Sequence, residues 1–404
     1  MVAPRPTPRF LGFLALGATI LFTAWVSGQQ DLLWVGVFCC ALPLISVVPL
    51  FLRRPSLTAT RSLDPEVVQR GDPVQVTLHL SAPDPAAPPA EIKDDPGPLL
   101  GPPRRFVLDP VDQQSAMATY ALNPQRRGRF TFSKCSFLVQ DPCGFWNRRY
   151  LLPTHTPLVV TPHVDPLPTL SLSIQGGLGE TPLPHTALIG PDDATVRTYA
   201  TGDDVRRIHW KATAHTGELM VRREEAAWDP TAWVLLDSRA LPHDEDPESA
   251  SFEWLVSAAA SIGVRLLTDG YSVGLVDAEG VTHVVDQHQE AGAAQWLEPL
   301  IDVEPTQEED LGKAVAPLSH EADDAIIVAL LSHLDDTATD PLLRLGSPAQ
   351  TRIALTLTAP TSSTGVPGQA QTTLEDHGWI VYPAHSGSKL HDIWSALGPR
   401  TGGR

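Results

Sequence analysis

Residues 231–238 read TAWVLLDS, a continuous apolar run that ends in an aspartate and a serine. A strand buried on both faces has this pattern, and such strands belong to parallel sheets that helices cover. A helical pattern follows over residues 251–270. Its apolar face comprises Phe252, Leu255, Val256, Ala259, Ile262, Gly263 and Leu266. The order strand then helix predicts an α/β domain.

Further strand candidates follow this first pair along the chain. They are YSVGLVD at 271–277, DDAIIVALL at 323–331, TRIALTLT at 351–358 and GWIVYPA at 378–384. Helical segments lie between most of them, and this alternation is typical of a doubly wound fold with a mainly parallel sheet. We therefore predict an α/β domain over residues 229–404.

The preceding part of the chain, residues 55–166, has a β pattern. In DPVQVTLHLS at 72–81, apolar residues alternate with polar ones, as in a half-buried strand. Residues 115–122, 128–141 and 156–164 repeat this alternation. Several short strands at such spacing predict a small antiparallel β-sandwich. The proline-rich stretch at 82–103 is interpreted as a mobile loop within it.

Two apolar runs without charges stand at the amino terminus, at about 10–27 and 32–52. Each is close to the ~20 residues that a helix needs to cross the hydrocarbon core of a bilayer. The first run could be a signal peptide, but the second follows after only GQQD, and no cleavage pattern separates them. We therefore favour two retained transmembrane helices over residues 1–54.

The charges around these runs predict their orientation. The flanking arginines are Arg5, Arg9, Arg53 and Arg54, and Asp31 is the only charge in the loop. By the positive-inside rule, both termini and all soluble domains are cytoplasmic, and the chain is a multi-pass protein of the plasma membrane. In this reducing compartment, Cys135 and Cys143 are expected to be free thiols.

Composition excludes several other classes of protein. The net charge of -18 argues against nucleic acid as a partner. Four cysteines in 404 residues do not make a disulfide scaffold. The chain contains no phosphate-binding loop, dinucleotide fingerprint or nucleophile elbow. His209 and His215 are not at a zinc spacing, and Cys143 in DPCGFW is interpreted as a structural turn residue.

Asp237, at the end of TAWVLLDS, raises the question of a metal site. In open α/β sheets, ligands bind beyond the carboxyl ends of the strands. A von Willebrand factor A-type domain completes a magnesium site there with an Asp-x-Ser-x-Ser pattern, but Arg239 and Leu241 replace the two serines here. Asp237 is therefore interpreted as a degenerate metal position that a neighbouring cation neutralises, with no metal or cofactor bound.

A dense polar stretch, VRTYATGDDVRRIHWK at 196–211, precedes the α/β domain. Asp203 or Asp204 can cap a helix through residues 205–215, Gly217 can end that helix, and a strand resumes at 218–224. Positive and negative charges nearly cancel, which favours a junction held by ion pairs. Trp210 favours a packed junction because an aromatic ring needs cover, and a solvated helix face stays the alternative.

These residues also resemble a known family. VRTYATGDDVRRIHWKATAHTGELMVRREE at 196–225 is similar to the signature of the domain-of-unknown-function fifty-eight family, within a connector and signature segment over residues 167–228. The signature and interaction residues are Arg197, Tyr199, Gly202, Asp203, Arg206, Arg207, His209, Trp210, Lys211, Leu219, Val221, Arg222 and Glu224. RGRF at 127–130 and DPCGFW at 141–146 look like the family's earlier β segment, where an aromatic or aliphatic residue more often replaces Cys143.

The resemblance implies paired membrane helices, a β segment, the signature and a von Willebrand A-like tail. Members have no established reaction, and they are associated with MoxR-type AAA+ ATPases and transglutaminase-like membrane proteins. The resemblance implies a chaperone-linked or envelope-related assembly role. The membrane hairpin, the charge-balanced junction and the lack of a complete catalytic set in the sequence favour a non-enzymatic scaffold or adaptor in the bilayer that docks an AAA+ ATPase. The alternative is a hydrolase or transferase with a site at Asp203, His209 and Arg207 or Lys211.

Overall fold

The computed structural model describes residues 3–52, 58–81, 90–108, 115–132, 134–152, 154–169, 196–199, 208, 210–222, 230–240, 250–321, 325–332, 334–345, 351–357 and 369–400. The chain forms two compact units. One comprises Met1–His163 with Leu300–Asp302, and the other comprises Val164–Pro299 with Val303–Arg404. We describe each unit by itself.

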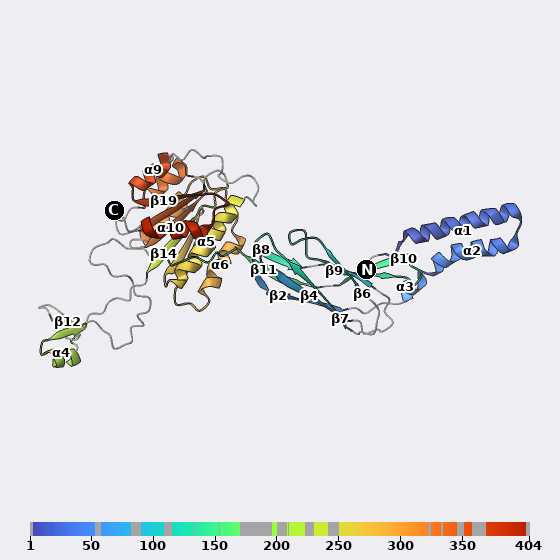
Figure 1. Ribbon diagram of the computed structural model, residues 1–404, viewed down its shortest axis with the longest axis horizontal. Coiled ribbons are helices and arrows are strands. Elements are labelled where there is room, and N and C mark those ends of the chain that lie inside the picture. Colours follow the sequence, from blue (N-terminus) through green and yellow to red (C-terminus); the bar gives the residue numbers. More distant parts are fainter. Residues whose placement is uncertain are drawn as a thin grey trace. The chain divides into compact units, whose positions relative to one another are not determined.

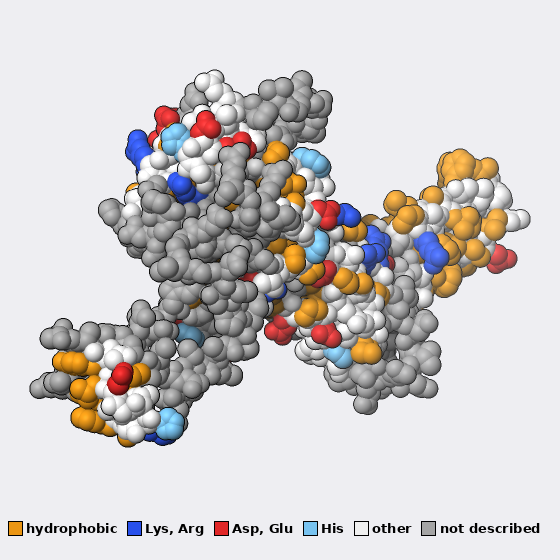
Figure 2. Space-filling view, turned by 60° about the vertical axis from the view of Figure 1, so that its left-hand side comes forward, with side chains coloured by type: hydrophobic (Ala, Val, Ile, Leu, Met, Phe, Trp, Pro, Cys, Tyr) orange, Lys and Arg blue, Asp and Glu red, His pale blue; other side chains and the backbone are white. Residues whose placement is uncertain are grey.

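A helical hairpin opens the first unit (Figure 1). Its helices are α1 (Pro8–Ser27), α2 (Gln30–Ile45) and the short α3 (Val48–Leu52). The spans Pro8–Ser27 and Gln30–Leu52 are long and apolar enough to cross a membrane. Figure 2 shows hydrophobic side chains over much of the visible face of the hairpin.

Glycines bring α1 and α2 close together. A Cβ on Gly17 would meet the Cys40 sulfur at 2.5 Å, and one on Gly36 would meet Leu21 at 2.7 Å. Small residues at such contacts let two membrane helices pack backbone to backbone. Large side chains such as Phe22, Trp25 and Trp34 instead point outward and are 64–80% exposed. The hairpin thus packs through its small residues and presents its large apolar ones to its surroundings.

The β domain follows in the same unit. Its strands are β1 (Arg5–Pro6), β2 (Thr58–Asp64), β3 (Val67–Gln69), β4 (Val74–Ser81), β5 (Ala90–Asp95), β6 (Arg104–Leu108), β7 (Ser115–Leu122), β8 (Gly128–Phe132), β9 (Lys134–Gln140), β10 (Trp146–Leu152) and β11 (Thr156–Thr161). They form the sheets β1-β10-β9-β5-β6, β2-β4-β7 and β3-β11-β8. Pairing is antiparallel except between β3 and β11. Each of the four segments predicted as strands contains a strand, and segment 128–141 contains two, β8 and β9.

The proline-rich stretch at 82–103, interpreted from the sequence as a mobile loop, contains a strand. Strand β5 lies inside it and pairs with both β6 and β9. The side chains of this segment follow the period of a strand, because Ile92 and Asp94, two residues apart, are both fully buried. This alternation of buried and partly exposed positions covers only one short segment, and the prolines around it make a loop the more obvious interpretation of the sequence.

The second unit contains an α/β domain, shown with its helices around the sheet in Figure 1. In chain order its elements are β14 (Thr231–Leu236), α5 (Ala250–Thr268), β15 (Ser272–Asp277), β16 (Thr282–Val285), α6 (Gly292–Asp302), α7 (Gly312–Glu321), β17 (Ile326–Leu331), α8 (Asp336–Leu342), β18 (Thr351–Leu357), α9 (Gln369–Asp376), β19 (Trp379–Ala384) and α10 (Leu390–Arg400). The sheet order is β16-β15-β14-β17-β18-β19. All neighbours are parallel except β15 and β16, which confirms the predicted mainly parallel sheet.

The sheet is buried because helices cover it. Side chains such as Leu318 of α7, Leu342 of α8 and Leu374 of α9 form one core with Trp233 and Leu235 of β14. Helix α5 packs against β14, β15 and β17 without joining that core, so it covers the other face. A helix on each face explains why TAWVLLDS shows no alternation of polar and apolar residues.

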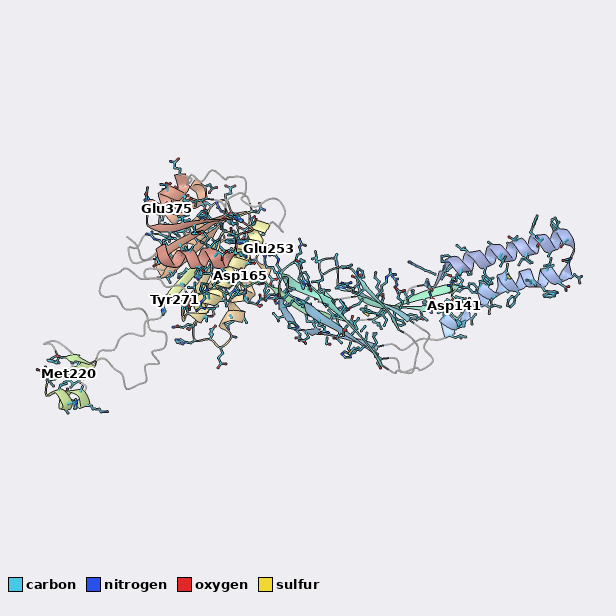
Figure 3. The ribbon with its side chains drawn as sticks, in the orientation of Figure 1. Asp141, Asp165, Met220, Glu253, Tyr271 and Glu375 are labelled. Atoms are coloured by element: carbon cyan, nitrogen blue, oxygen red, sulfur yellow. The ribbon has the colours of Figure 1, made fainter. Side chains whose placement is uncertain are left out.

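Residues 164–169, which include the first residues of the predicted connector, belong to this unit as well. The backbone N–H of Asp165 donates to the hydroxyl of Ser261 on α5 at 2.9 Å. The indole of Trp394 on α10 donates to the carbonyl of Pro168 at 3.0 Å. Figure 3, which labels Asp165, shows this segment beside α5. The polypeptide thus joins the α/β unit well before the signature stretch.

Candidate functional site

The carboxyl end of β14 holds the candidate site, at the edge where open α/β sheets bind ligands. Asp237 follows Leu236, the last residue of the strand, and its N–H donates to the carbonyl of Leu330 on β17 at 2.9 Å. This bond extends the pairing of β14 with β17 by one residue. The side chain of Asp237 is fully buried.

Both oxygens of Asp237 accept hydrogen bonds from the chain itself. Arg239 donates from Nε to Oδ1 at 2.8 Å and from Nη2 to Oδ2 at 2.9 Å, which is a bidentate pair. The hydroxyl and backbone N–H of Ser332 both donate to Oδ2, at 2.6 and 3.1 Å. The predicted neutralisation of Asp237 by the cation two residues on is the arrangement in the structure.

The loop that carries Arg239 is itself held in place. The hydroxyl of Ser238 accepts from the N–H of Ala278 at 3.2 Å, and its carbonyl accepts from the N–H of Thr306 at 2.6 Å. Asp335, which caps α8 by accepting from Ala338 at 2.9 Å, lies 3.7 Å from the Arg239 guanidinium. The arginine therefore sits in a fixed position between two carboxylates.

The environment of Arg239 keeps it charged. Burial alone would lower the pKa of its guanidinium, but the hydrogen bond and charge of Asp237, helped by Asp335, outweigh burial and hold the pKa above its ordinary value. The guanidinium is only 2% exposed. A permanently charged, buried arginine beside Asp237 repels any second cation at the same place.

These contacts do not fit a divalent cation at Asp237. A magnesium or calcium ion needs several oxygen ligands with free lone pairs, and here Arg239 and Ser332 already use both carboxylate oxygens. Among the described residues, no group of three or more His, Cys, Asp or Glu side chains could hold a metal. Asp237 therefore acts as the anchor of an internal ion pair.

The described residues of the signature stretch form a small motif. Strands β12 (Val196–Thr198) and β13 (Met220–Arg222) pair antiparallel, with Arg197 opposite Val221, and α4 (Trp210–Thr216) lies between them in sequence. The N–H of Met220, labelled in Figure 3, donates to the hydroxyl of Thr213 at 3.0 Å and ties strand to helix. Gly217, with φ of 77°, ends the helix as predicted.

Two expectations about this stretch need correction. The helix begins at Trp210 instead of residue 205, because Ile208 forms a β-bridge with Val221. Trp210 is also not covered by a packed junction: it is 68% exposed, and Leu219 is 44% exposed. In β13, Val221 is buried, at 4%, and Met220 is only partly buried. Among its described residues, the motif thus has one buried apolar side chain, Val221, and one exposed aromatic side chain, Trp210.

The remaining signature residues are divided between described and undescribed parts of the chain. Tyr199 donates its N–H to the carbonyl of Leu219 at 2.7 Å, and Lys211 lies in α4. Outside the described residues lie Gly202, Asp203, Arg206, Arg207, His209 and Glu224. The proposed ion pairing of this stretch and the alternative enzymatic site therefore both stay predictions.

Sequence reasoning missed a buried polar cluster in the β domain. Arg61 on β2 pairs with Asp94 on β5 through Nη2–Oδ1 and through Nε–Oδ2 at 3.3 Å, with both side chains fully buried. The hydroxyl of Tyr120 on β7 donates to the same carboxylate at 2.7 Å. The guanidinium also lies 4.7 Å from the Phe132 ring centroid. Because β2 and β7 belong to one sheet and β5 to another, this cluster ties two sheets together.

The carboxylate of Asp94 also influences its neighbours. Burial, with the Asp94 hydrogen bond and charge, raises the pKa of Tyr120. Burial and the same charge raise the pKa of the Cys135 thiol, opposite Asp94 in the sheet, to about 11. Both groups therefore stay neutral near pH 7. One feature of the sequence could have revealed this cluster: Asp94 and Arg61 are charged residues at inward-facing positions of alternating strands.

Comparisons with known proteins add a family and three weak structural likenesses. Two crystal structures of proximal thread matrix protein 1 from the mussel byssus match with TM-scores of 0.31 and 0.32, at 12% and 10% identity. Each match covers 42% of this chain. This chain spans about half the length of the mussel proteins, 47% and 46%. The CARDB domain of a Pyrococcus furiosus protein, crystallised with di-metal ions, matches at a TM-score of 0.19 and 14% identity, over 26% of this chain and 93% of its own. No curated protein matches the chain.

The family match covers the part of the chain that holds both candidate regions. It begins just before β12 of the signature motif and runs through the Asp237 site to the first residue of β19. Residues 195–379 match the model described as "Protein of unknown function DUF58", and this region of the chain belongs to that family.

Proposed function

We propose that this protein is a membrane-anchored, non-enzymatic scaffold or adaptor whose cytoplasmic α/β domain docks a partner. The observation that carries the proposal is the closed state of Asp237, held by Arg239 and Ser332. Ligands of α/β sheets gather at this edge, and here the chain itself satisfies the carboxylate. A von Willebrand A-like domain with such an edge would bind its partner through protein surface, without a bridging metal.

The anchor in this proposal is the amino-terminal hairpin. Spans Pro8–Ser27 and Gln30–Leu52 have suitable length and composition. Arg5 and Arg9 on one side and Asp31 in the loop favour a multi-pass topology with both termini in the cytoplasm. The β domain, which we propose to be a sandwich, would then stand at the cytoplasmic surface of the plasma membrane.

The partner in this proposal is an AAA+ ATPase of the MoxR type, as the family resemblance implies. A transglutaminase-like membrane protein is the second expected partner. The exposed Trp210 and Leu219 of the signature motif supply a contact surface, since solvent-exposed tryptophan is a frequent anchor of protein interfaces. The pathway would be envelope-related or one of complex assembly.

Site-specific photo-crosslinking in intact membranes tests this proposal. A photoreactive residue replaces Trp210 in one variant and Val284 of β16 in a control, because Val284 is also exposed, at 59%. We expect an AAA+ ATPase to crosslink from position 210 and not from position 284. Recovery of no ATPase from position 210, or equal recovery from both positions, would contradict the proposal.

A further inference from the structure

The first unit contains an open cavity where the hairpin meets the β domain. Its volume is about 540 Å³, within the range of small-molecule sites. It is lined by Arg9, Gly12, Phe13, Leu42, Cys143 and Phe145. The walls thus come from the start of α1, the end of α2 and the DPCGFW turn, and they are apolar except for one arginine and one thiol.

Asp141 builds the turn that forms one wall. Its buried carboxylate accepts from the N–H of Cys143 at 3.2 Å and from the N–H of Trp146 at 2.6 Å. Gly144 adopts φ of 72°, which a side chain would strain. Figure 3 labels Asp141 at the end of the β domain next to the hairpin. The turn is therefore rigid, and it holds Cys143 and Phe145 against the cavity.

The turn is bound directly to the hairpin. Thr7 donates its N–H to the carbonyl of Phe145 at 2.9 Å and its hydroxyl to that of Gly144 at 2.8 Å. The indole of Trp146 donates to the carbonyl of Pro43 in α2 at 2.7 Å. The rings of Phe13 and Phe145 meet edge to face at 4.9 Å. These contacts fix the cavity between a membrane span and a soluble domain.

With the membrane anchoring proposed above, the cavity lies along α1 at a membrane–water boundary. Arg9 is the second residue of α1, and Phe13 lies one turn deeper, about 6 Å along the axis. The exposed surface continues beyond Phe13 with Leu16, which is 50% exposed. The cavity therefore has the cation of Arg9 nearest the amino end of α1, and its lining continues along the helix with Gly12 and Phe13.

We infer that this cavity binds an anionic phospholipid, with the phosphate at Arg9 and an acyl chain along Phe13, Leu42 and Phe145. The inference rests on the membrane anchoring proposed above. A guanidinium recognises phosphate through paired hydrogen bonds, and the apolar walls match the chain of the same molecule. Anionic lipids are also the lipids that basic residues attract at a cytoplasmic membrane surface.

Lipid retention by the purified full-length protein tests the inference. The protein is reconstituted with phosphatidylcholine and phosphatidylglycerol, purified again, and analysed for bound lipid by native mass spectrometry. We expect phosphatidylglycerol to be retained in preference to phosphatidylcholine. Arg9→Gln should weaken this retention roughly tenfold through loss of a charged hydrogen-bond donor.

A second variant fills the cavity without changing charge. A Cβ on Gly12 would meet nothing within 4 Å, so Gly12→Leu fits the helix and occupies the space of the acyl chain. We expect it to lose phosphatidylglycerol as Arg9→Gln does. Arg149→Gln is the matched control, because Arg149 is an exposed arginine of β10 outside the cavity lining, and it should retain the lipid.

Three outcomes would overturn the inference: equal retention of both lipids by the wild type, full retention by Gly12→Leu, or equal losses in Arg9→Gln and Arg149→Gln. Resistance to alkaline extraction from membranes is measured in parallel. Extraction of the wild type would refute the membrane anchor itself. Resistance combined with any of the three outcomes would refute only the lipid site.

Discussion

The β domain and the α/β domain each contain a buried Arg–Asp pair with the same chemistry but a different origin. Arg239 and Asp237 are two residues apart in one loop of the α/β domain. Arg61 and Asp94 are 33 residues apart, on strands of different sheets in the β domain. In both pairs the side chains are at most 2% exposed.

The two pairs differ in what they hold together. The Arg239 pair closes the end of one strand, and Ser332 gives its aspartate a second source of hydrogen bonds. The Arg61 pair connects two sheets, with Tyr120 as the other donor from a side chain. A local pair closes a site, whereas a long-range pair stabilises the packing of a domain, and the following predictions test this difference.

The largest effect is expected from Arg61→Met. Removal of the Arg61 guanidinium leaves Asp94 buried without a cation. Breaking a buried ion pair in this way lowers the free energy of unfolding by about 3–5 kcal/mol. Hydrogen exchange of the full-length protein should show faster opening of β2 and β5. The double variant Arg61→Met, Asp94→Leu should regain most of the protection, because it removes both charges. Unchanged exchange in the single variant would show that the pair does not hold the sheets.

Arg239→Ala should cost less, about 2–3 kcal/mol, because Ser332 still donates to Asp237. Exchange should accelerate at the ends of β14 and β17 and stay unchanged in the β domain. Arg239→Lys keeps the charge without the paired geometry and should lie between wild type and alanine. A loss larger than that of Arg61→Met would reverse the proposed ranking of the two pairs.

The buried Cys135 thiol, which lies opposite Asp94 in the sheet, should also make the stability of the β domain depend on high pH. The pKa of Cys135 is raised from 9.0 to about 11, by burial first and then by the charge of Asp94. The unfolded chain therefore loses this proton at lower pH than the folded one. Stability is complete below pH 9 and falls as the pH rises toward 11, by about 2 kcal/mol.

Exchange rates of β9 measured between pH 8 and pH 11, corrected for the intrinsic rate, check this dependence. Cys135→Ala should reduce the decline. The part that remains would come from Tyr120, whose pKa is raised in the same direction. A decline of equal size in the variant would remove Cys135 as its cause.

Tyr120→Phe is the mildest change, since it removes one donor from Asp94 and leaves Arg61 in place. We expect a loss of about 1 kcal/mol, seen as faster exchange in β7. A loss as large as that of Arg61→Met would mean that the three groups act as one cooperative network.

Much of the architecture was accessible from the sequence. Uninterrupted apolar strands, the period of α5 and the two uncharged runs are local patterns, and each corresponds to an element of the structure. The neutralisation of Asp237 was accessible for the same reason, because Arg239 is two residues away. The signature stretch identified the family, although the start of its helix and the cover of Trp210 were wrong.

The tertiary structure decided what depends on distant residues. Strand β5 was hidden among prolines until pairing with β6 and β9 identified it. Ser332 meets Asp237 from 95 residues away, and Arg61 meets Asp94 across two sheets. The cavity beside Arg9 exists because the DPCGFW turn, more than 100 residues later, packs on α1 and α2. Local periodicity depends only on neighbouring residues, whereas the burial of a charge depends on the complete fold that surrounds it.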